Sequence, residues 1–378
     1  MPNTLSSWRE RCGWLPPAGA TVLVALSGGV DSAVTAALLQ EGGYRVVAAT
    51  MKTWDEYRDR GEIDPRRAER GCCSMAAADD CLRIAEHLGI PYHLYDFQEE
   101  FRTAVIDRFV RDYAAGRTPS PCVPCNGVLK FGHLLAEADR LGCDYIATGH
   151  YARRTDVAGV AALLRGVDAH RDQAYFLATV PHAALRRSIF PLGGLWKSDT
   201  RTLAAAFGLP VAAKAESREI CFVDDDYRAF LARSGAGGGD PGAVVGLDGR
   251  PLGSHAGIRN YTIGQRRGLG IATGQPRYVV ELDGPRNEVV VGDERDLYHR
   301  EVAVADLNWL ADRPRDGRVN AQIRSTHRAA PATLTSTAGG DLHVCFDEPV
   351  RAPSPGQTVA LFSGDWLLGG GTLERVID

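Results

Sequence analysis

One hexapeptide near the start of the chain constrains the fold more than any other stretch: residues 27–32 read Ser-Gly-Gly-Val-Asp-Ser. The apolar run 22–26 before it predicts a buried strand, and the apolar segment 33–39 after it predicts a helix. Two adjacent glycines let backbone N–H groups converge at the start of that helix, where the helix dipole favours an anion. The sequence therefore predicts a phosphate site in this loop, and the alternative is a tight turn with a serine cap.

The loop differs from two common phosphate-binding motifs. It has neither the terminal Gly-Lys-Ser/Thr of the P-loop nor the spaced glycines of the dinucleotide fold. It resembles the SGGxDS loop of the PP-loop ATP pyrophosphatases, a family that splits ATP between its α- and β-phosphates. The resemblance implies that the phosphate bound here belongs to ATP.

The segment from 21 to about 150 alternates predicted strands and helices, as a doubly wound parallel sheet of an α/β domain requires. The predicted strands are 21–26, 45–51, 91–97 and 144–148, and the predicted helices are 32–41, 75–88, 98–115 and 128–141. A further helix is expected at 202–207, where Gly208 and Pro210 end it. The charged stretch 53–71 predicts a mobile excursion that could close over a substrate.

A glycine-rich run at 234–242 separates this part from a chain of short β-type segments. The predicted strands there are 243–247, 258–263, 277–282, 287–291, 318–324, 342–346, 357–362 and 366–374, with hairpin turns expected at Asp248-Gly249 and Asp283-Gly284. We therefore expect three domains: a catalytic sheet domain at 1–217, a small linking domain at 218–285 and a β-barrel domain at 286–378.

Composition narrows the class of protein. The chain has 378 residues, a formal net charge of −4 and nine cysteines. No apolar run reaches the roughly 20 residues of a membrane span, and the N-terminal stretch lacks the apolar core of a signal peptide, so we expect a cytoplasmic protein with no membrane partner. An odd cysteine count without a secretion signal favours thiol, redox or metal chemistry over a disulfide framework. The negative net charge does not indicate nucleic-acid binding, so a nucleic acid would have to bind at a local basic patch.

Two of the cysteines lie in a stiff loop. Residues 118–126 read Thr-Pro-Ser-Pro-Cys-Val-Pro-Cys-Asn, and a predicted helix follows. The prolines hold Cys122 and Cys125 three residues apart, and a helix N-terminus close to Cys125 favours its thiolate form. The pattern predicts a reactive thiol; the alternatives are a redox CxxC pair or half of a zinc knuckle. Cys221, between Ile220 and Phe222, would by itself be read as a core residue.

Several further motifs occur in a fixed order along the chain. They are Cys72-Cys73-Ser74, Ala147-Thr148-Gly149-His150-Tyr151-Ala152, Arg171-Asp172-Gln173 before Tyr175-Phe176-Leu177, Glu219-Ile220-Cys221-Phe222, residues 261–270 and Pro355-Gly356-Gln357. With the hexapeptide and the proline-rich loop, they resemble the family of tRNA-specific 2-thiouridylases, which make 2-thiouridine at the wobble position. The resemblance begins at about residue 20 and runs to the end of the chain.

The resemblance implies a set of site residues. ATP is expected at Leu26, Ser27, Gly28, Gly29, Val30, Asp31, Ser32 and Ala33, with Met51 and Gly149 lining the nucleotide and Asp31 facing Mg²⁺ at the pyrophosphate end. Cys125 corresponds to the nucleophile and Cys221 to the cysteine that carries a persulfide. Contacts with tRNA are expected from His150, Arg171, Asp172, Gln173, Arg324, Ser325 and Gln357, and the target base is expected against Ser120, Pro121 and Cys122.

The implied reaction has two stages. ATP adenylates the 2-oxygen of uracil, which turns a poor leaving group into a good one, and the persulfide on Cys221 then supplies sulfur. Cys125 releases that sulfur by forming a disulfide with Cys221, and a thiol reductant resets the pair. The implied partners are tRNA, a persulfide donor such as a cysteine desulfurase or a relay protein, and the reductant. The uridine must leave the anticodon stack to reach the site.

Some alternatives stay open at this point. Cys122 stands where many members of the family have aspartate, and Cys122, Cys125 and Cys221 could together hold a [4Fe–4S] cluster. His150 could cap a helix, and residues 264–270 could form a hairpin with two surface arginines instead of a phosphate contact. Two rival functions are an ATP-dependent synthetase that adenylates a carboxylate, and an iron–sulfur or redox protein that binds RNA without turnover. Cys72-Cys73 could meet a sulfur donor.

Overall fold

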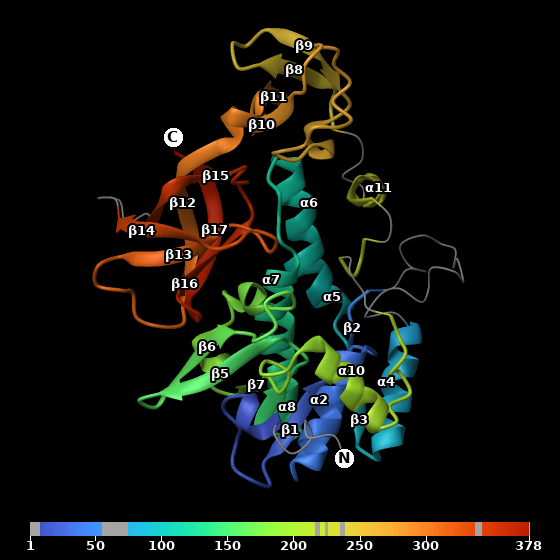
Figure 1. Cartoon of the computed structure of the whole chain (residues 1–378). Coiled ribbons are helices and arrows are strands. Elements are labelled where there is room, and N and C mark those ends of the chain that lie inside the picture. Colours follow the sequence, from blue (N-terminus) through green and yellow to red (C-terminus); the bar gives the residue numbers. More distant parts are fainter. Residues whose placement is uncertain are drawn as a thin grey trace. The chain divides into compact units, whose positions relative to one another are not determined.

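The computed structural model describes residues 8–54, 75–215, 220–223, 226–234, 239–336 and 342–377. The expected charged excursion and the pair Cys72-Cys73 lie almost wholly outside these ranges. The chain forms two compact units (Figure 1). Unit 1 comprises Met1–Ala104, Cys122–Asp224 and Asp365–Leu367, and unit 2 comprises Val105–Pro121, Asp225–Gly364 and Leu368–Asp378.

Unit 1 is built on a parallel sheet with the strand order β3-β2-β1-β4-β7. Its strands are β1 (Thr21–Ala25), β2 (Arg45–Lys52), β3 (Tyr92–Asp96), β4 (Tyr145–Ala147) and β7 (Ser188–Ile189). The chain leaves β1 toward β2 on one side and later returns to β4 on the other, so the strand order reverses at β1. The predicted doubly wound α/β fold is confirmed, and such a reversal is where open α/β sheets bind ligands.

Helices of unit 1 pack against this sheet. The helices α2 (Val30–Glu41) and α4 (Met75–Leu88) both contact β2, while α8 (Leu134–Arg140) contacts β4 and α10 (Lys197–Ala206) contacts α2. One face of α2 and the buried strand β1 share a core in which Val22, Val24 and Leu38 are fully buried. The apolar runs around the hexapeptide therefore form the centre of the domain.

Two predicted helices are less regular than the sequence suggested, and the second of them also begins earlier. The segment 98–115 contains α5 (Gln98–Phe101), the π-helical η1 (Arg102–Ile106) and α6 (Asp107–Ala114). The cysteine loop already turns into helix at α7 (Cys122–Pro124) and continues through the π-helical η2 (Cys125–His133) into α8. Wide π-type turns often occur at functional sites.

A hairpin in unit 1 was not predicted. Strands β5 (Ala152–Val157) and β6 (Val160–Arg165) pair antiparallel around Ala158 and Gly159, both of which have positive φ. Short elements follow: η3 (Ala174–Leu177) and α9 (His182–Leu185). The predicted helix at 202–207 corresponds to α10, which begins five residues earlier at Lys197.

The N-terminal stretch, for which the sequence predicted no element, belongs to the core of unit 1. Trp8 and Cys12 are buried in the same cluster as the strands of the sheet. The guanidinium of Arg154 lies 3.4 Å from the ring centre of Trp14, and Gly13 forms a parallel bridge with Arg154. These contacts close one end of the sheet domain.

Unit 2 contains a four-stranded sheet in the order β10-β11-β8-β9. Its strands are β8 (Gly242–Gly246), β9 (Pro251–His255), β10 (Tyr278–Asp283) and β11 (Glu288–Gly292), and the two expected hairpin turns are confirmed between β8 and β9 and between β10 and β11. The predicted strand 258–263 is wrong: the short helix η4 (Ile258–Asn260) stands there. Ile258 and Tyr261 are both buried, a spacing of three that suits a helical turn and not strand alternation.

The remaining strands of unit 2 form a closed six-stranded barrel, because β12 pairs with both β15 and β17. They are β12 (Tyr298–Trp309), β13 (Arg318–Gln322), β14 (Ala330–Ser336), β15 (Leu342–Arg351), β16 (Thr358–Ser363) and β17 (Trp366–Val376), preceded by η5 (Glu294–Leu297). The expected β-barrel is confirmed. In the same unit α6 packs on α11 (Tyr227–Arg233), with stacked rings of Tyr113 and Tyr227 4.8 Å apart. Across the described parts of the chain, no helix is long and apolar enough to span a bilayer.

Candidate active site

The hexapeptide lies between β1 and α2, and its two glycines serve different needs. Gly28 has φ +68°, and a Cβ there would lie 2.7 Å from the carbonyl oxygen of Ala77, so the fold itself requires glycine. Gly29 has an ordinary φ of −101°, and a Cβ there would meet only the Ser27 hydroxyl, at 3.5 Å. The backbone at Gly29 is therefore open to a ligand.

The helix N-terminus that follows has no side-chain cap. Gly29 is the N-cap of α2 and offers no side chain to the first-turn N–H groups. Ser32 Oγ instead accepts from the N–H of Ser27 at 3.1 Å and donates to the carbonyl of Gly29 at 3.1 Å, which holds the loop closed on itself. The serine-cap alternative is wrong, and the first-turn amides point where an anion binds favourably.

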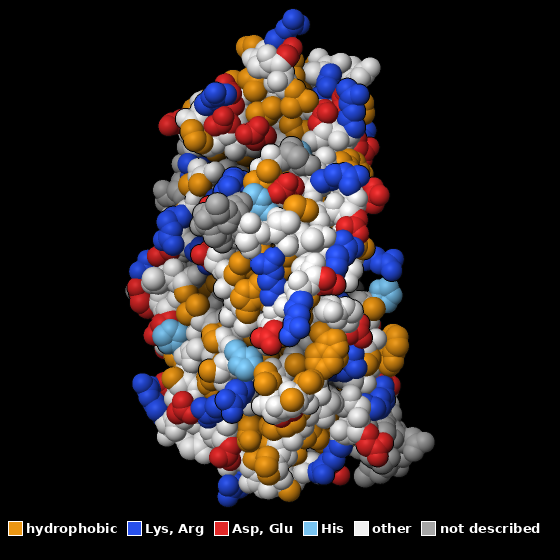
Figure 2. Space-filling view, turned by 90° about the vertical axis from the view of Figure 1, so that its left-hand side faces the viewer, with side chains coloured by type: hydrophobic (Ala, Val, Ile, Leu, Met, Phe, Trp, Pro, Cys, Tyr) orange, Lys and Arg blue, Asp and Glu red, His pale blue; other side chains and the backbone are white. Residues whose placement is uncertain are grey.

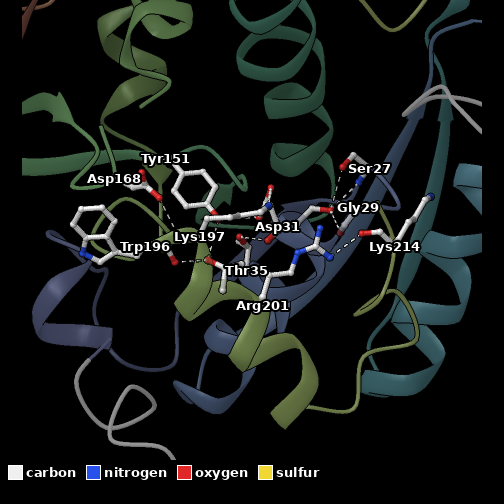
Figure 3. Close-up of polar contacts among 12 residues, drawn as sticks. Ser27, Gly29, Asp31, Thr35, Tyr151, Asp168, Trp196, Lys197, Arg201 and Lys214 are labelled. Atoms are coloured by element: carbon white, nitrogen blue, oxygen red, sulfur yellow. Dashed lines mark hydrogen bonds and ion pairs between the residues drawn. The ribbon is translucent and has the colours of Figure 1, made fainter. Parts of the chain in front are cut away.

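An ion pair stands beside this loop (Figure 3). Lys197, the first residue of α10, donates from Nζ to both carboxylate oxygens of Asp31, at 2.6 and 2.8 Å. The Lys197 side chain is 13% exposed and that of Asp31 is 33% exposed. Tyr151 Oη lies 2.9 Å from Asp31 Oδ1. A carboxylate that would repel phosphate is thus neutralised by an ammonium group that could itself bind phosphate.

A second lysine contacts the loop from the other side. Lys214 Nζ donates to the carbonyl of Gly28 at 3.0 Å and to Asp80 Oδ2 at 2.5 Å. Burial alone would raise the pKa of Asp80, but hydrogen bonds from Lys214 and Arg83 outweigh it and lower that pKa. Arg201 of α10 donates to the carbonyl of Lys214 at 2.7 Å and so ties this segment to the helix that carries Lys197.

The sequence did not predict that Lys197 and Lys214 contact the hexapeptide. The chain has only four lysines, Lys52, Lys130, Lys197 and Lys214, and two of them meet at the hexapeptide. That scarcity was the one available signal. Nothing in the local pattern at 197 or 214 indicates that either residue lies beside a loop more than 160 positions earlier in the chain.

Two other expected nucleotide contacts lie at the carboxyl ends of strands adjoining β1. Met51, near the end of β2, is buried. Gly149 follows β4, and a Cβ there would lie 2.9 Å from the amide nitrogen of Ser32 and 3.1 Å from Asp31 Cβ. The turn after β4 therefore packs directly on the first turn of α2, and this contact needs glycine.

The two cysteines of the expected relay, Cys125 and Cys221, belong to unit 1, as does Cys122. Cys122 is exposed at the start of α7, Cys125 is half-buried at the start of η2, and Cys221 is half-buried. Phe222, next to Cys221, is buried with its ring 5.6 Å from that of Phe101. Asn126, next to Cys125, donates to the carbonyl of Phe176 at 3.0 Å. Each cysteine thus has a neighbour anchored in the core.

The buried cysteines differ in character. Burial raises the pKa of Cys12 to about 12 and that of Cys81 to about 11, so these thiols stay protonated near neutral pH. Among the residues that the structure describes, no group of three or more His, Cys, Asp or Glu side chains is arranged to hold a metal ion. Glu219, which precedes Cys221 in the motif at 219–222, is not among the residues that the structure describes.

Several residues expected to contact tRNA are engaged within the protein. His150 is 8% exposed, its Nδ1 lies 2.7 Å from Thr148 Oγ1, and its ring packs beside Phe131 and Phe190. Burial, and to a lesser extent Lys130, lowers the pKa of His150 well below 6.5. His150 is thus a neutral core residue in this structure and caps no helix.

The segment 171–173 is held tightly in a turn. The Asp172 carboxylate accepts from Arg165 Nη1 at 2.7 Å and from the backbone N–H groups of Gly166 and Ala174 at 2.9 and 3.1 Å. Gln173 Oε1 accepts from the N–H of Tyr151 at 3.0 Å. Of the three expected contacts, the Asp172 and Gln173 side chains therefore shape the protein.

The expected contacts of unit 2 fall in two places. Arg324 Nη2 donates to the carbonyl of Arg351 at 2.7 Å, and Ser325 beside it is exposed. Gln357 Nε2 donates to the carbonyls of Thr118 and Pro119 at 3.0 and 3.3 Å. Gln357 thus holds the segment that leads to Ser120, which is half-buried, and Pro121, which is buried.

The segment 261–270 forms no hairpin in the structure, so that alternative is wrong. Gly264, Gly268 and Gly270 have positive φ, and Arg266 and Arg267 between them are exposed. The face drawn in Figure 2 carries Lys and Arg side chains dispersed among Asp and Glu, without one continuous basic area. A polyanion on that face would meet separate cations.

The sheet is doubly wound, and an uncapped glycine loop lies where its strand order reverses. The carboxylate of that loop and two lysine ammonium groups lie at the same place. This fold and site are those of an ATP-using protein of the PP-loop class. Three family profiles match the chain in order. They are described as tRNA methyl transferase HUP domain (residues 20–225), tRNA methyl transferase PRC-barrel domain (228–293) and aminomethyltransferase beta-barrel domain (299–373).

Curated relatives cover almost the whole chain. A tRNA-specific 2-thiouridylase MnmA of Moorella thermoacetica is 47% identical over 94% of this chain and 99% of its own length. One of Symbiobacterium thermophilum is 44% identical over 96% of this chain and 94% of its own length. The chain belongs to the family of tRNA-specific 2-thiouridylases.

A solved structure shares a weaker likeness. This structure is the U34-tRNA thiolase NcsA from Methanococcus maripaludis with its [4Fe-4S] cluster. The two chains are 19% identical, with a TM-score of 0.37 over 61% of this chain and 69% of the other. A likeness at that level bears neither on the fold nor on the cluster question.

Proposed function

We propose that this protein is an ATP-dependent tRNA-uridine 2-sulfurtransferase that thiolates the wobble uridine of tRNA. The observation that carries the proposal is the loop at 26–33, built for phosphate and set in the same unit as Cys125 and Cys221. The high identity to 2-thiouridylases across both units supports it. The word methyl transferase in the family profiles names a different chemistry, and neither a PP-loop nor a cysteine pair is needed to transfer a methyl group.

ATP binding follows from the loop geometry. The first-turn amides of α2 and the open backbone at Gly29 bind phosphate oxygens, and Lys197 supplies a positive charge beside them. Met51 and Gly149 are the proposed neighbours of the nucleotide at the sheet edge. Asp31 is partly exposed at the same place and fits Mg²⁺, which proteins commonly hold through one or two carboxylates together with substrate phosphates. When bound, the ion would neutralise charge on the pyrophosphate.

The first chemical step makes the 2-oxygen of uracil a leaving group. The oxygen attacks the α-phosphorus, the bond to the β-phosphate oxygen breaks, and pyrophosphate departs with the electron pair. The loop amides and Lys197 stabilise the charge that develops on the phosphates, because they are already oriented toward it. Removing one such preoriented donor in other enzymes costs about 10²- to 10³-fold in kcat.

The second step transfers sulfur. The terminal sulfur of a persulfide on Cys221 bonds to C2 of the adenylated uracil, and AMP leaves with the 2-oxygen. The thiolate of Cys125 then attacks Cys221 Sγ, which breaks the S–S bond to the transferred sulfur and forms a Cys125–Cys221 disulfide. A dithiol reductant returns both cysteines to thiols. A cysteine desulfurase or a relay protein is the proposed source of the persulfide.

The cluster alternative receives less support. A [4Fe–4S] centre needs at least three ligands brought together, with Cys122, Cys125 and Cys221 as the candidates. The part of the chain that the structure describes contains no such group of three arranged for a metal. No step is therefore assigned to a cluster.

Binding of tRNA is proposed for both units, through Arg171, Arg324, Ser325 and the exposed arginines at 266 and 267. Ser120, Pro121 and Cys122 are the proposed wall against the target base, held in place by Gln357. His150, Asp172 and Gln173 are proposed to support this surface from within. A cytoplasmic location, where tRNA is modified, accords with the absence of a membrane-spanning helix in the described residues.

The function is tested by pyrophosphate release from ATP and Mg²⁺, with and without an unmodified tRNA transcript. Release that requires a transcript with uridine at the wobble position supports the proposal, and a transcript with cytidine there is the matched control. A synthetase that adenylates a carboxylate would release pyrophosphate independently of tRNA. A redox protein that only binds RNA would release none.

A further inference from the structure

Tyr151 occupies a position between the turn at 171–173 and the nucleotide loop. Its backbone is paired twice with Gln173: the N–H of Tyr151 donates to Gln173 Oε1 at 3.0 Å, and the N–H of Gln173 donates to the carbonyl of Tyr151 at 2.9 Å. Its hydroxyl lies 2.9 Å from Asp31 Oδ1 (Figure 3). One rigid side chain therefore joins the turn to the carboxylate of the hexapeptide.

The hydroxyl is held from a second direction. Thr200 Oγ1 on α10 lies 2.9 Å from Tyr151 Oη, three residues after Lys197. Tyr151 Oη is the donor toward both Asp31 and Thr200, and the charged carboxylate is the stronger acceptor of its one proton. The Thr200 hydroxyl donates to the carbonyl of Trp196 at 3.4 Å. The Tyr151 side chain is 3% exposed, so it cannot swing into solvent when the loop changes.

The turn itself is stiff. Asp172 is bonded to Arg165, Gly166 and Ala174, so a displacement of 171–173 is not absorbed within the turn. The two hydrogen bonds between Gln173 and the Tyr151 backbone pass that displacement to residue 151. The aromatic ring has only two side-chain torsions and is packed in the core, so movement of its backbone moves its hydroxyl relative to Asp31.

We infer that Tyr151 is a positioning residue that couples the turn at 171–173 to the Asp31 carboxylate of the nucleotide loop. Contact of the RNA with the turn at 171–173 sets the Tyr151 hydroxyl against Asp31, and this orients Asp31 and Lys197 for the pyrophosphate end of ATP. The inference rests on the proposed function. It assigns to Tyr151 a role in activation and no contact with either substrate.

The discriminating variant is Tyr151→Phe, which keeps the buried ring and removes only the hydroxyl. Lys197 still bonds both oxygens of Asp31, so the Kd for ATP, measured in the absence of tRNA, should stay within threefold of wild type. At saturating tRNA, kcat should fall at least tenfold while the Kd for tRNA is unchanged. Tyr44→Phe is the matched control, because Tyr44 is also buried in unit 1 and donates one hydrogen bond, to the Pro16 carbonyl.

A double-variant cycle with Gln173→Leu tests the path. If both residues act in one path, Tyr151→Phe combined with Gln173→Leu at saturating tRNA is no slower than the slower single variant. A wild-type kcat at saturating tRNA in Tyr151→Phe, or a loss of kcat matched by an equal loss of affinity for ATP or tRNA, overturns the inference. Wild-type protein that releases pyrophosphate independently of tRNA, or never releases it, overturns the proposed function instead.

Discussion

Replacing Lys197 by methionine removes an ammonium group and keeps a side chain of similar length, so this change isolates the charge beside the hexapeptide. In the structure the ammonium donates to both oxygens of Asp31, at 2.6 and 2.8 Å. A hydrogen bond to a charged group contributes about 1.5–3 kcal/mol, and the partial exposure of Asp31 favours the lower end for the pair. Loss of about 1.5 kcal/mol in unfolding free energy is therefore expected.

The effect on ATP should be larger than the effect on stability. Lys197→Met removes a preoriented cation and leaves the Asp31 carboxylate to repel phosphates; two charges about 4 Å apart near a protein surface interact by about 4 kcal/mol. We expect kcat/KM for ATP to fall by about 10²- to 10³-fold, in line with the loss of one preoriented donor in other enzymes. The Kd for tRNA should not change.

The assay is pyrophosphate release at saturating tRNA, with tRNA affinity measured separately by fluorescence anisotropy. Arg250→Met is the control for loss of a cation, because the Arg250 side chain is 84% exposed and forms an ion pair with nearby Asp248. Combining Lys197→Met with Asp31→Asn should lower the free energy of unfolding no further than Lys197→Met alone, since the uncompensated carboxylate is then gone. Pyrophosphate release should stay low in the double variant, because Asp31 is the proposed partner of Mg²⁺. Activity of Lys197→Met within threefold of wild type would show that the Lys197 ammonium group does not contribute to the use of ATP.

Other changes give separate outcomes. Gly29→Ala should fold normally but bind ATP at least tenfold more weakly, whereas Gly28→Ala should lower the melting temperature because its Cβ meets a backbone carbonyl; the reverse order would contradict the roles given to the two glycines. Cys221→Ser should still release pyrophosphate with tRNA yet form no thiolated product, and loss of both would make Cys221 structural. Affinity for tRNA should fall as salt rises in a filter-binding titration despite the negative net charge, and a flat profile would exclude an arginine contact surface. Because burial lowers the pKa of His150, its imidazole gains a proton only in the unfolded chain below pH 6.5. His150 should therefore contribute a drop of about 1.4 kcal/mol in the free energy of unfolding between pH 7.5 and pH 5.5, and denaturant titrations of His150→Asn should show a drop smaller by that amount.

The sheet domain could be predicted because its signals are local. The apolar run at 22–26 is buried on both faces, and the glycine pair at 28–29 follows it directly. The hairpin at 152–165 was missed because its turn is Ala158-Gly159 and not Asn-Gly or Asp-Gly, and its first strand is rich in polar residues. The segment 258–263 was misassigned because two apolar residues three apart were read as part of a strand.

The residues of the site also differ in how far the sequence predicts them. Residue type and spacing predict the hexapeptide and the cysteine loop. Lys197 and Lys214 reach the hexapeptide only through the crossing of distant elements, and no local pattern marks them. Tyr151 stands in the motif at 147–152, but nothing in that motif indicates its contact with Asp31. The resemblance could indicate that His150 matters, but not that its ring is buried among aromatic side chains.

The proposed reaction places sulfur on the wobble uridine and consumes ATP. Mass spectrometry of nucleosides from an unmodified tRNA transcript, incubated with the purified protein, ATP, Mg²⁺ and a persulfide donor, measures this directly. We expect 2-thiouridine at the wobble position, formed only when ATP is present and absent in Cys125→Ser and in Cys221→Ser. Thiouridine formed without ATP, or at undiminished yield in both cysteine variants, would contradict it.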